Sequence, residues 1–266
     1  MNISFIANKF SAQLNQNNVE YTLKTLSDSY LLNEWIGKEI EVRHTGKFIC
    51  LDCQKSVKKF YSQGLCYVCT MSSPMNSECI IRPELCQAHL GIGRDIEWEK
   101  THHNQPHIVY LANSGGLKVG VTRADQIPTR WIDQGADETI IIAKTPYRQL
   151  AGMIEVFLKD YLSDKTNWRT MLKNQKVEGI NLLEEKYHYA NLLKSSYESY
   201  ICEDDSIYTL HYPTSLLTQS IQSIKLEKVK QLRGTLTGIK GQYLIFDAKN
   251  VLNIRSHAGF EVEMTY

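Results

Sequence analysis

The chain contains 266 residues, of which 42% are hydrophobic and 22% are charged, and its formal net charge is +1. These values are ordinary for a soluble globular protein of one to three domains. The net charge argues neither for nor against nucleic acid, but no segment is strongly basic, so tight nonspecific binding to duplex nucleic acid is not expected from charge alone. No apolar run approaches the roughly 20 residues of a membrane-spanning helix, and the first residues lack a signal-peptide pattern. We therefore expect a cytoplasmic protein that does not associate with a membrane.

Residues 1–49 contain short strand-like runs and no pattern that suggests chemistry. Apolar and polar side chains alternate over residues 19–23 and 39–43, which predicts half-buried antiparallel strands. We interpret this N-terminal β segment as scaffold.

Six of the seven cysteines fall between residues 50 and 86, and the first four form two C-x-x-C pairs, Cys50/Cys53 and Cys66/Cys69, with twelve residues between the pairs. Each pair can present two thiolates to one ion, so two pairs complete a tetrahedral site. This spacing predicts a structural zinc ion rather than a catalytic one, because four protein ligands leave no open position for water. Iron would also fit these ligands, and the alternative is four free buried cysteines.

A second group of metal-ligand types follows in residues 79–107. Cys79, Cys86 and His89 could supply three ligands to a second zinc ion, with His102 or His103 as the fourth. The spacing is irregular, and the alternative is that the thiols are small core residues and the histidines face solvent. Together these two groups define a predicted zinc-binding region over residues 50–106.

Residues 107–135 predict a hairpin followed by a helix. Two β-type runs, 108–111 and 117–121, flank Asn113-Ser114-Gly115-Gly116, whose glycines supply the positive φ of a tight reversal. Two strands and a helix would bring a tyrosine and several cations towards one surface, namely Tyr110, Lys118, Arg123 and Arg130. Such a surface is suited to a phosphate or a carboxylate.

A buried strand and an amphipathic helix come next. Residues 139–143 are a continuous apolar run, and Pro146 opens a helix for which Thr145 is the predicted N-cap. Glu155 lies at the apolar edge of that helix, and carboxylates are seldom buried without a partner or a metal. The alternative places Glu155 on a solvated flank.

The remainder of the chain predicts a helical connector over residues 176–205 and a small antiparallel sheet or partly open barrel over residues 206–266. Four cations precede that sheet, Lys225, Lys228, Lys230 and Arg233. They are consistent with an oligonucleotide-binding surface or with a solvated charged edge.

The order of these elements resembles the GIY-YIG endonuclease superfamily over about residues 107–170. Hairpin, Arg-bearing helix, third strand and Glu-bearing helix follow one another, and the family motifs match Val109-Tyr110, Lys118-Val119-Gly120, Thr122, Arg130 and Glu155. More closely, the segments KVGVTR, PTRWIDQGA and DKTNWR resemble an uncharacterised bacterial branch with an N-terminal zinc-binding region. The fold class expected is therefore α+β: a zinc knuckle region, a small GIY-YIG-like three-stranded sheet with helices over residues 107–175, and a C-terminal antiparallel β sheet or barrel.

The resemblance implies metal-dependent hydrolysis of a phosphodiester in DNA or RNA. Tyr110 would help to activate water, Arg130 would neutralise the phosphate, and Glu155 would hold one Mg²⁺ ion. Lys118 stands where the family has a tyrosine, and a lysine of ordinary pKa is a poor proton relay at neutral pH. Candidate nucleic-acid contacts are Arg123, Asn167 and Arg169.

Two other functions stay open at this point. The chain could be a catalytically inactive, zinc-containing nucleic-acid-binding or regulatory protein, or a zinc-stabilised scaffold for a protein partner. The substitution of Lys118 for a tyrosine is the feature on which the choice between hydrolysis and binding depends.

Overall fold

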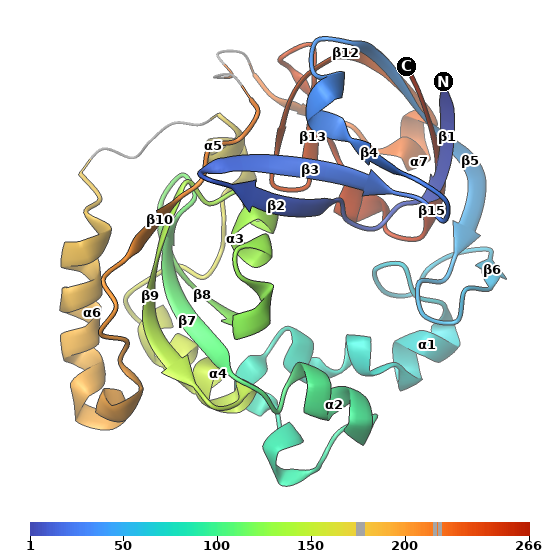
Figure 1. Cartoon of the computed structure of the whole chain (residues 1–266). Helices are drawn as coiled ribbons and strands as arrows, with labels where there is room; N and C mark the ends of the chain where they lie inside the picture. The colour runs from blue at the N-terminus through green and yellow to red at the C-terminus, as the bar shows by residue number, and fades with distance from the viewer. Residues whose placement is uncertain (174–178, 215–216, 218–219) are drawn as a thin grey trace. The chain divides into compact units, whose positions relative to one another are not determined.

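The computed structural model describes residues 1–173, 179–214, 217 and 220–266, and it divides into two compact units. Unit 1 comprises Met1–Met71, Leu172–Asn174 and His211–Tyr266, and unit 2 comprises Ser72–Met171 and Gln175–Leu210. Unit 2 is thus inserted into the chain between the two main parts of unit 1 (Figure 1).

Unit 1 is built on an eight-stranded sheet to which both ends of the chain contribute. Its order is β1-β15-β5-β12-β13-β14-β11, with β6 paired to β5. Only β11 and β14 are parallel among the described pairs. The strands are β1 (Asn2–Ile6), β5 (Glu39–Ile49), β6 (Ser56–Val57), β11 (Gln222–Ser223), β12 (Gln231–Lys240), β13 (Tyr243–Phe246), β14 (Asn250–Asn253) and β15 (Phe260–Thr265).

A second, three-stranded antiparallel sheet completes the β structure of unit 1. It contains β2 (Ser11–Asn15), β3 (Asn18–Lys24) and β4 (Ser29–Leu31), and the unit also includes the short helix α7 (Leu226–Val229). In β3 the alternate residues Val19, Tyr21 and Leu23 are buried. This alternation is the one that the sequence predicts, because successive side chains of a strand point to opposite faces.

Unit 2 is built on a four-stranded antiparallel sheet in the order β10-β9-β7-β8. The strands are β7 (His107–Asn113), β8 (Leu117–Arg123), β9 (Glu138–Thr145) and β10 (Ile207–Thr209). Strands β7 and β8 form the predicted hairpin, and every residue of β7 is buried. Because β7 pairs with a strand on each side, it is the central strand on which the unit is assembled.

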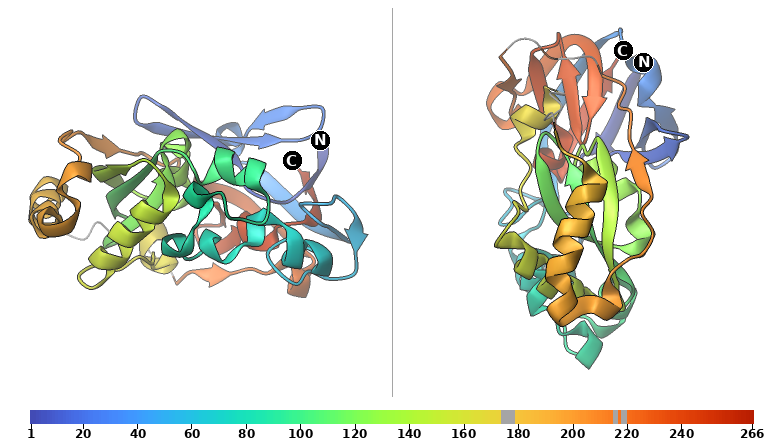
Figure 2. Two further views of the ribbon diagram at one scale, coloured as in Figure 1. Left: turned by 90° about the horizontal axis from the view of Figure 1, so that it is seen from below. Right: turned by 90° about the vertical axis from the view of Figure 1, so that its left-hand side faces the viewer.

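Helices cover both faces of this sheet. Helices α4 (Arg148–Lys159) and α6 (Leu182–Tyr197) pack with Val109 and Leu111 of β7 in one apolar core, and Figure 2 shows α6 lying along the strands. Helix α3 (Thr129–Asp133) places Trp131 against Tyr110 and Tyr208 on the other side. Alternation along β7 thus separates Tyr110 from the α4 core.

The rest of unit 2 consists of short helical turns. The cysteine-rich part, residues 74–90, contains four 3₁₀ turns, at Pro74–Asn76, Glu78–Ile80, Pro83–Leu85 and Ala88–Leu90, and leads to α2 (Ile96–His102). Asp95 begins α2 as its N-cap by accepting from the backbone N–H of Trp98. Two further short helices lie where the chain passes between the units: α1 (Tyr67–Ser72) belongs to unit 1 except for its last residue, and α5 (Trp168–Leu172) belongs to unit 2 except for its last residue.

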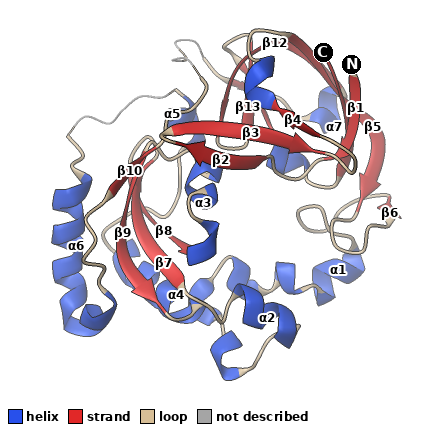
Figure 3. Cartoon of the chain, viewed as in Figure 1, coloured by secondary structure: helices blue, strands red, loops and turns tan. Residues whose placement is uncertain are grey.

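The mixed α and β content confirms the predicted α+β class (Figure 3). The hairpin, α3, β9 and α4 also occur in the predicted order. Strands β1 and β5, from residues 1–49, form one sheet with β11 to β15, from the C-terminal part of the chain. The N-cap prediction is wrong, since α4 begins at Arg148 after Tyr147 and Thr145 ends β9, where its hydroxyl donates to the carbonyls of His107 and Tyr147. No helix in the described part of the chain is long and apolar enough to cross a membrane.

Candidate functional site

Tyr110 fits into unit 2 because the residue opposite it on the neighbouring strand is a glycine. Tyr110 is fully buried and lies directly opposite Gly120 in the β7–β8 pairing. A Cβ atom on Gly120 would lie 2.7 Å from the Tyr110 hydroxyl and 2.8 Å from Cζ, closer than real Cβ contacts. The glycine of the second sequence motif is therefore required so that the tyrosine ring can cross the strand.

Lys118 reaches the same place from β8. Its amino group and the Tyr110 hydroxyl both donate to Oε1 of Gln134, at 2.5 and 2.8 Å, and only 3% of Lys118 is exposed. Burial, reinforced by Arg130, lowers the pKa of Lys118 to about 7, against the smaller opposing effects of Glu155 and Asp164. Gln134 follows α3 and was not predicted as part of the site, because nothing in its local sequence marks it.

Arg130 and Glu155 complete this group. Burial raises the pKa of Tyr110 to about 12, Arg130 opposes this rise, and Glu155 adds to it. Arg130 and Glu155 thus act on both Tyr110 and Lys118, so the four predicted residues share one electrostatic environment. They come from β7, β8, α3 and α4, respectively.

Glu155 is a buried carboxylate rather than a solvated one. It is 8% exposed, and burial raises its pKa although Lys159 opposes the rise. Lys159 lies 3.5 Å from Glu155 and 3.2 Å from Asp164, so the lysine links the two carboxylates. One amino group shared in this way leaves carboxylate oxygens able to accept a hard cation such as Mg²⁺.

The predicted nucleic-acid contacts are less uniform. Arg123 pairs with Asp125 at 3.3 Å. The Asn167 side chain caps α5 by accepting from the backbone N–H groups of Arg169 and Thr170, so it has a structural task. Arg169 is exposed, with its guanidinium over the ring of Trp168 at 4.3 Å.

The four cysteines of the paired C-x-x-C motifs lie together in unit 1. Their sulfur atoms are within 4.8 Å of one another, and those of Cys53 and Cys66 are 4.0 Å apart. Sulfur ligands of a tetrahedral zinc ion, with Zn–S near ~2.3 Å, are about 3.8 Å apart. The predicted proximity is confirmed, and the cluster could bind a metal such as zinc.

Hydrogen bonds around Cys50 favour its thiolate form. Burial alone would raise its pKa, but backbone N–H groups of Cys66, Cys53 and Asp52 together lower the pKa to about 6. The Cys66 amide lies 3.4 Å from the Cys50 sulfur. Because cysteine binds a metal as the thiolate, these hydrogen bonds prepare Cys50 for coordination.

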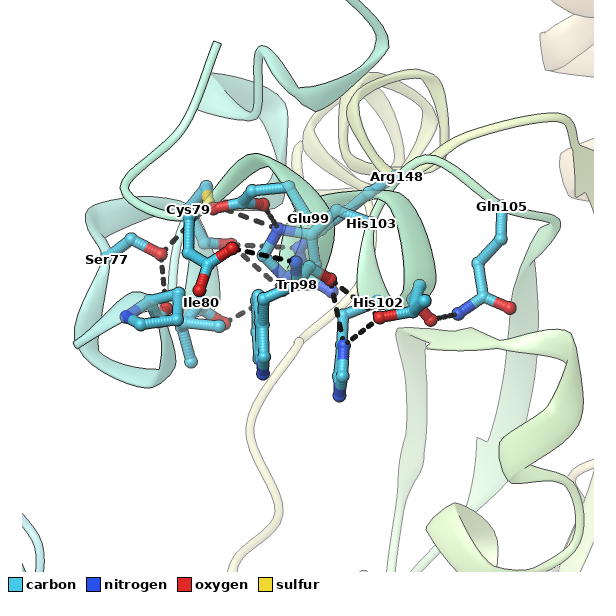
Figure 4. A network of polar contacts seen from close by, with 12 residues as sticks. Ser77, Cys79, Ile80, Trp98, Glu99, His102, His103, Gln105 and Arg148 are labelled. Atoms are coloured by element: carbon cyan, nitrogen blue, oxygen red, sulfur yellow. Dashed lines mark hydrogen bonds and ion pairs between the residues drawn. The ribbon is translucent and has the colours of Figure 1, made fainter. Parts of the chain in front are cut away.

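A second group of ligand atoms lies in unit 2, and its membership differs from the prediction. Cys79, Cys86, Glu99 and His103 place their ligand atoms within 4.8 Å of one another. His89, the predicted third ligand, is not among them, because its ring is stacked on Tyr147 at 4.3 Å. Figure 4 shows the side chains of Cys79, Glu99 and His103 together.

Glu99 is the member that the sequence analysis missed. It precedes His103 by four residues, so α2 brings both side chains to the same face. The sequence feature that could have identified Glu99 is Asp95, an N-cap residue that predicts the start of this helix. Of the two histidines proposed as the closing ligand, His103 joins the group, while His102 stacks on Trp98 at 3.9 Å.

One protein family matches this chain over residues 37–262, and its description is "Protein of unknown function (DUF2797)". The chain belongs to the DUF2797 family. The match spans most of both units of this DUF2797 protein, including both groups of metal-ligand types. No curated protein matches the chain. No solved structure matches it either.

Proposed function

We propose that this DUF2797 protein is a metal-dependent hydrolase of phosphodiesters in DNA or RNA, with a GIY-YIG-like site formed by Tyr110, Lys118, Arg130 and Glu155. The observation that supports it most is the convergence of Tyr110 and Lys118 on one acceptor, Oε1 of Gln134, within the electrostatic reach of Arg130 and Glu155. Together a phenol, an amine, a guanidinium and a carboxylate can activate water, stabilise charge on phosphate and hold a metal ion.

Each side chain has a task that its surroundings support. Lys118 acts as the general base towards water, because a pKa of about 7 leaves much of the amine neutral near neutral pH. Tyr110 stays protonated, since its pKa is raised to about 12, and it orients the nucleophile by hydrogen bonding. Arg130 donates to the phosphate oxygens with planar geometry.

Glu155 is the residue that would hold Mg²⁺. A Mg²⁺ ion bound there supplies Lewis-acid stabilisation of the charge that develops on phosphate. The carboxylate fits this role because it is buried and its nearest cation, Lys159, is also paired with Asp164. Lys159 can therefore stay paired with Asp164 when Glu155 binds a metal cation.

We further propose that the four-cysteine cluster of unit 1 holds a structural zinc ion, because its thiolate spacing suits tetrahedral coordination with no open position. Beside it, a surface cavity of about 460 Å³ is lined by two exposed tyrosines and two exposed lysines, Tyr61, Tyr67, Lys58 and Lys59. Exposed aromatic rings with cations suit the stacked bases and phosphates of a single strand. This surface supports nucleic acid as the partner.

The alternative is a binding protein without hydrolysis. The observation in its favour is the ion pair between Glu155 and Lys159, which competes with Mg²⁺ for the carboxylate. In that case Arg130 and Lys118 would bind phosphate groups of the nucleic acid. The affinity for nucleic acid would fall as the salt concentration rises, and no cleavage would occur.

The deciding experiment compares substitutions of two carboxylates that lie five residues apart. Single-stranded, duplex and branched DNA and RNA are incubated with Mg²⁺ and either the wild type, Glu155→Gln or Asp160→Asn. Asp160 is exposed at the end of α4, so Asp160→Asn serves as the matched control. We expect cleavage by the wild type and by Asp160→Asn only. Binding without cleavage by the wild type would establish the alternative, and cleavage by Glu155→Gln would refute the assigned Mg²⁺ ligand.

A further inference from the structure

We propose that Cys79, Cys86, Glu99 and His103 form a second zinc centre, and that this centre fixes helix α4 and thereby the position of Glu155. The proposed function does not need such a centre, and the predicted ligand set included His89 in place of Glu99. The inference rests on the ligand geometry, on the charge balance and on the contacts between the cysteine-bearing turns and α4.

The ligand geometry fits one ion. The Cys79 sulfur lies 3.7 Å from Nδ1 of His103, and sulfur and nitrogen ligands of tetrahedral zinc are separated by about 3.6 Å. The same Nδ1 atom contacts Oε2 of Glu99, an oxygen that makes no hydrogen bond. Both residues are 3% exposed, so bulk water does not reach this oxygen and this nitrogen. A cation bound among them satisfies both.

The charges of the site also balance with a divalent ion. Two thiolates, one carboxylate and a neutral imidazole carry three negative charges, which a Zn²⁺ ion and one further positive charge would cancel. Arg148 supplies that charge, since Cys79 and Cys86 are its principal electrostatic partners. The guanidinium is anchored by donating to the carbonyl of Cys79 at 2.9 and 3.0 Å and to that of Ile80 at 3.0 Å (Figure 4).

These contacts connect the proposed centre to α4. Arg148 is the first residue of α4, and its backbone N–H donates to the carbonyl of His103 at 3.0 Å. One turn later Gly152 packs so closely on the turn between the two cysteines that a Cβ atom would lie 2.3 Å from the Glu84 nitrogen. Arg148, Gly152 and Glu155 follow at spacings of four and three residues and share one face of the helix. The face held by the cysteine-bearing turns is therefore the face that presents Glu155.

Zinc content tests the ligand set directly. We expect about two zinc ions per chain in the wild type and about one in His103→Ala, because loss of one ligand opens the site. His102→Ala and His89→Ala are the matched controls, and both should retain about two ions, as removal of a histidine outside the site leaves the ligands intact. Two ions in His103→Ala, or one in His89→Ala, would overturn the assignment.

A milder substitution covers the case in which His103→Ala does not fold. Glu99→Gln keeps three ligands and removes one negative charge, so it should release its second zinc ion at a lower chelator concentration than the wild type. Release at an unchanged concentration would remove Glu99 from the ligand set.

The link to α4 is tested by amide hydrogen exchange. Chelation of the second ion, or Glu99→Gln, should speed exchange across residues 149–158 and leave the amides of β7 nearly unchanged. Unchanged exchange in α4 would show that the centre does not hold the helix. The consequence for Glu155 as a Mg²⁺ ligand rests on the proposed function, but the zinc content and the exchange do not, so the two ideas can fail separately.

Discussion

Substitution of Gly120 by alanine tests whether Tyr110 is placed as described. The added Cβ atom would lie 2.7 Å from the Tyr110 hydroxyl, 2.8 Å from Cζ and 3.2 Å from Cε1. Because the ring is fully buried and Trp131 lies 5.9 Å away between centroids, it has little room to retreat. Overpacking of this kind costs about 1–3 kcal/mol, and we expect Gly120→Ala to destabilise unit 2 by that amount.

The informative comparison is the same substitution in a Tyr110→Leu background. Leucine lacks the hydroxyl oxygen and the two ring carbons that meet the new methyl group, so the clash disappears. What then remains is the ordinary gain of about 0.5–1 kcal/mol from replacing glycine by alanine in a strand. Gly120→Ala should therefore change sign, from destabilising beside Tyr110 to neutral or stabilising beside leucine.

Gly120→Ala, Tyr110→Leu and the double variant form a double-mutant cycle. Native-state hydrogen exchange of the β7 and β9 amides measures the stability of each variant within unit 2 alone. The cleavage assay adds a second readout, since displacement of the Tyr110 hydroxyl from Gln134 should slow hydrolysis by Gly120→Ala. Equal effects of Gly120→Ala in the two backgrounds would refute the claim that the glycine is needed for the tyrosine.

Four further results are expected. The proposed hydrolysis should become faster as pH increases through about 7, where Lys118 loses its proton. Lys118→Met should abolish this inflection in the pH profile, and an inflection that persists would belong to another group. The lowered pKa should also make the folded chain less stable as pH falls from 10.5 to about 7, a dependence that Lys118→Met should lack in urea titrations. Asn167→Ala should destabilise α5 by about 1 kcal/mol, measured by amide exchange, because two capping bonds are lost; unaltered exchange would contradict the cap. Cys53→Ser should lose one zinc ion and lower the melting temperature, and retention of the metal would exclude Cys53 as a ligand.

Features that depend on neighbouring residues could be predicted from the sequence. The Gly115-Gly116 reversal places β7 beside β8, and the paired C-x-x-C spacing brings four sulfur atoms together, because both follow from short stretches of backbone. The strand β9 could also be predicted, because its apolar residues are consecutive in the sequence. Each of these patterns is satisfied within about twenty residues, as local turn and ligand geometry requires.

Other features depend on parts of the chain that meet only after folding. The pairing of β1 with β15 joins residues from the first and last strands, and no local pattern specifies that choice. Gln134 becomes the shared acceptor of Tyr110 and Lys118 only because α3 packs on the sheet. His89 follows Cys86 at a plausible ligand spacing, yet the turn after Cys86 directs its ring to Tyr147 instead.

The interrupted construction of unit 1 has a consequence during synthesis on the ribosome. Strand β5 receives its neighbours β12 and β15 only after the whole of unit 2 has been translated, so for that interval its edges lack their final partners. An unpaired strand edge is a site of misassembly. The four-cysteine cluster begins immediately after β5 and needs only the next twenty residues, so the zinc ion that we propose there would anchor the end of β5 early in synthesis. Zinc starvation would then reduce the yield of correctly assembled protein made under those conditions more than it would harm molecules that had already folded.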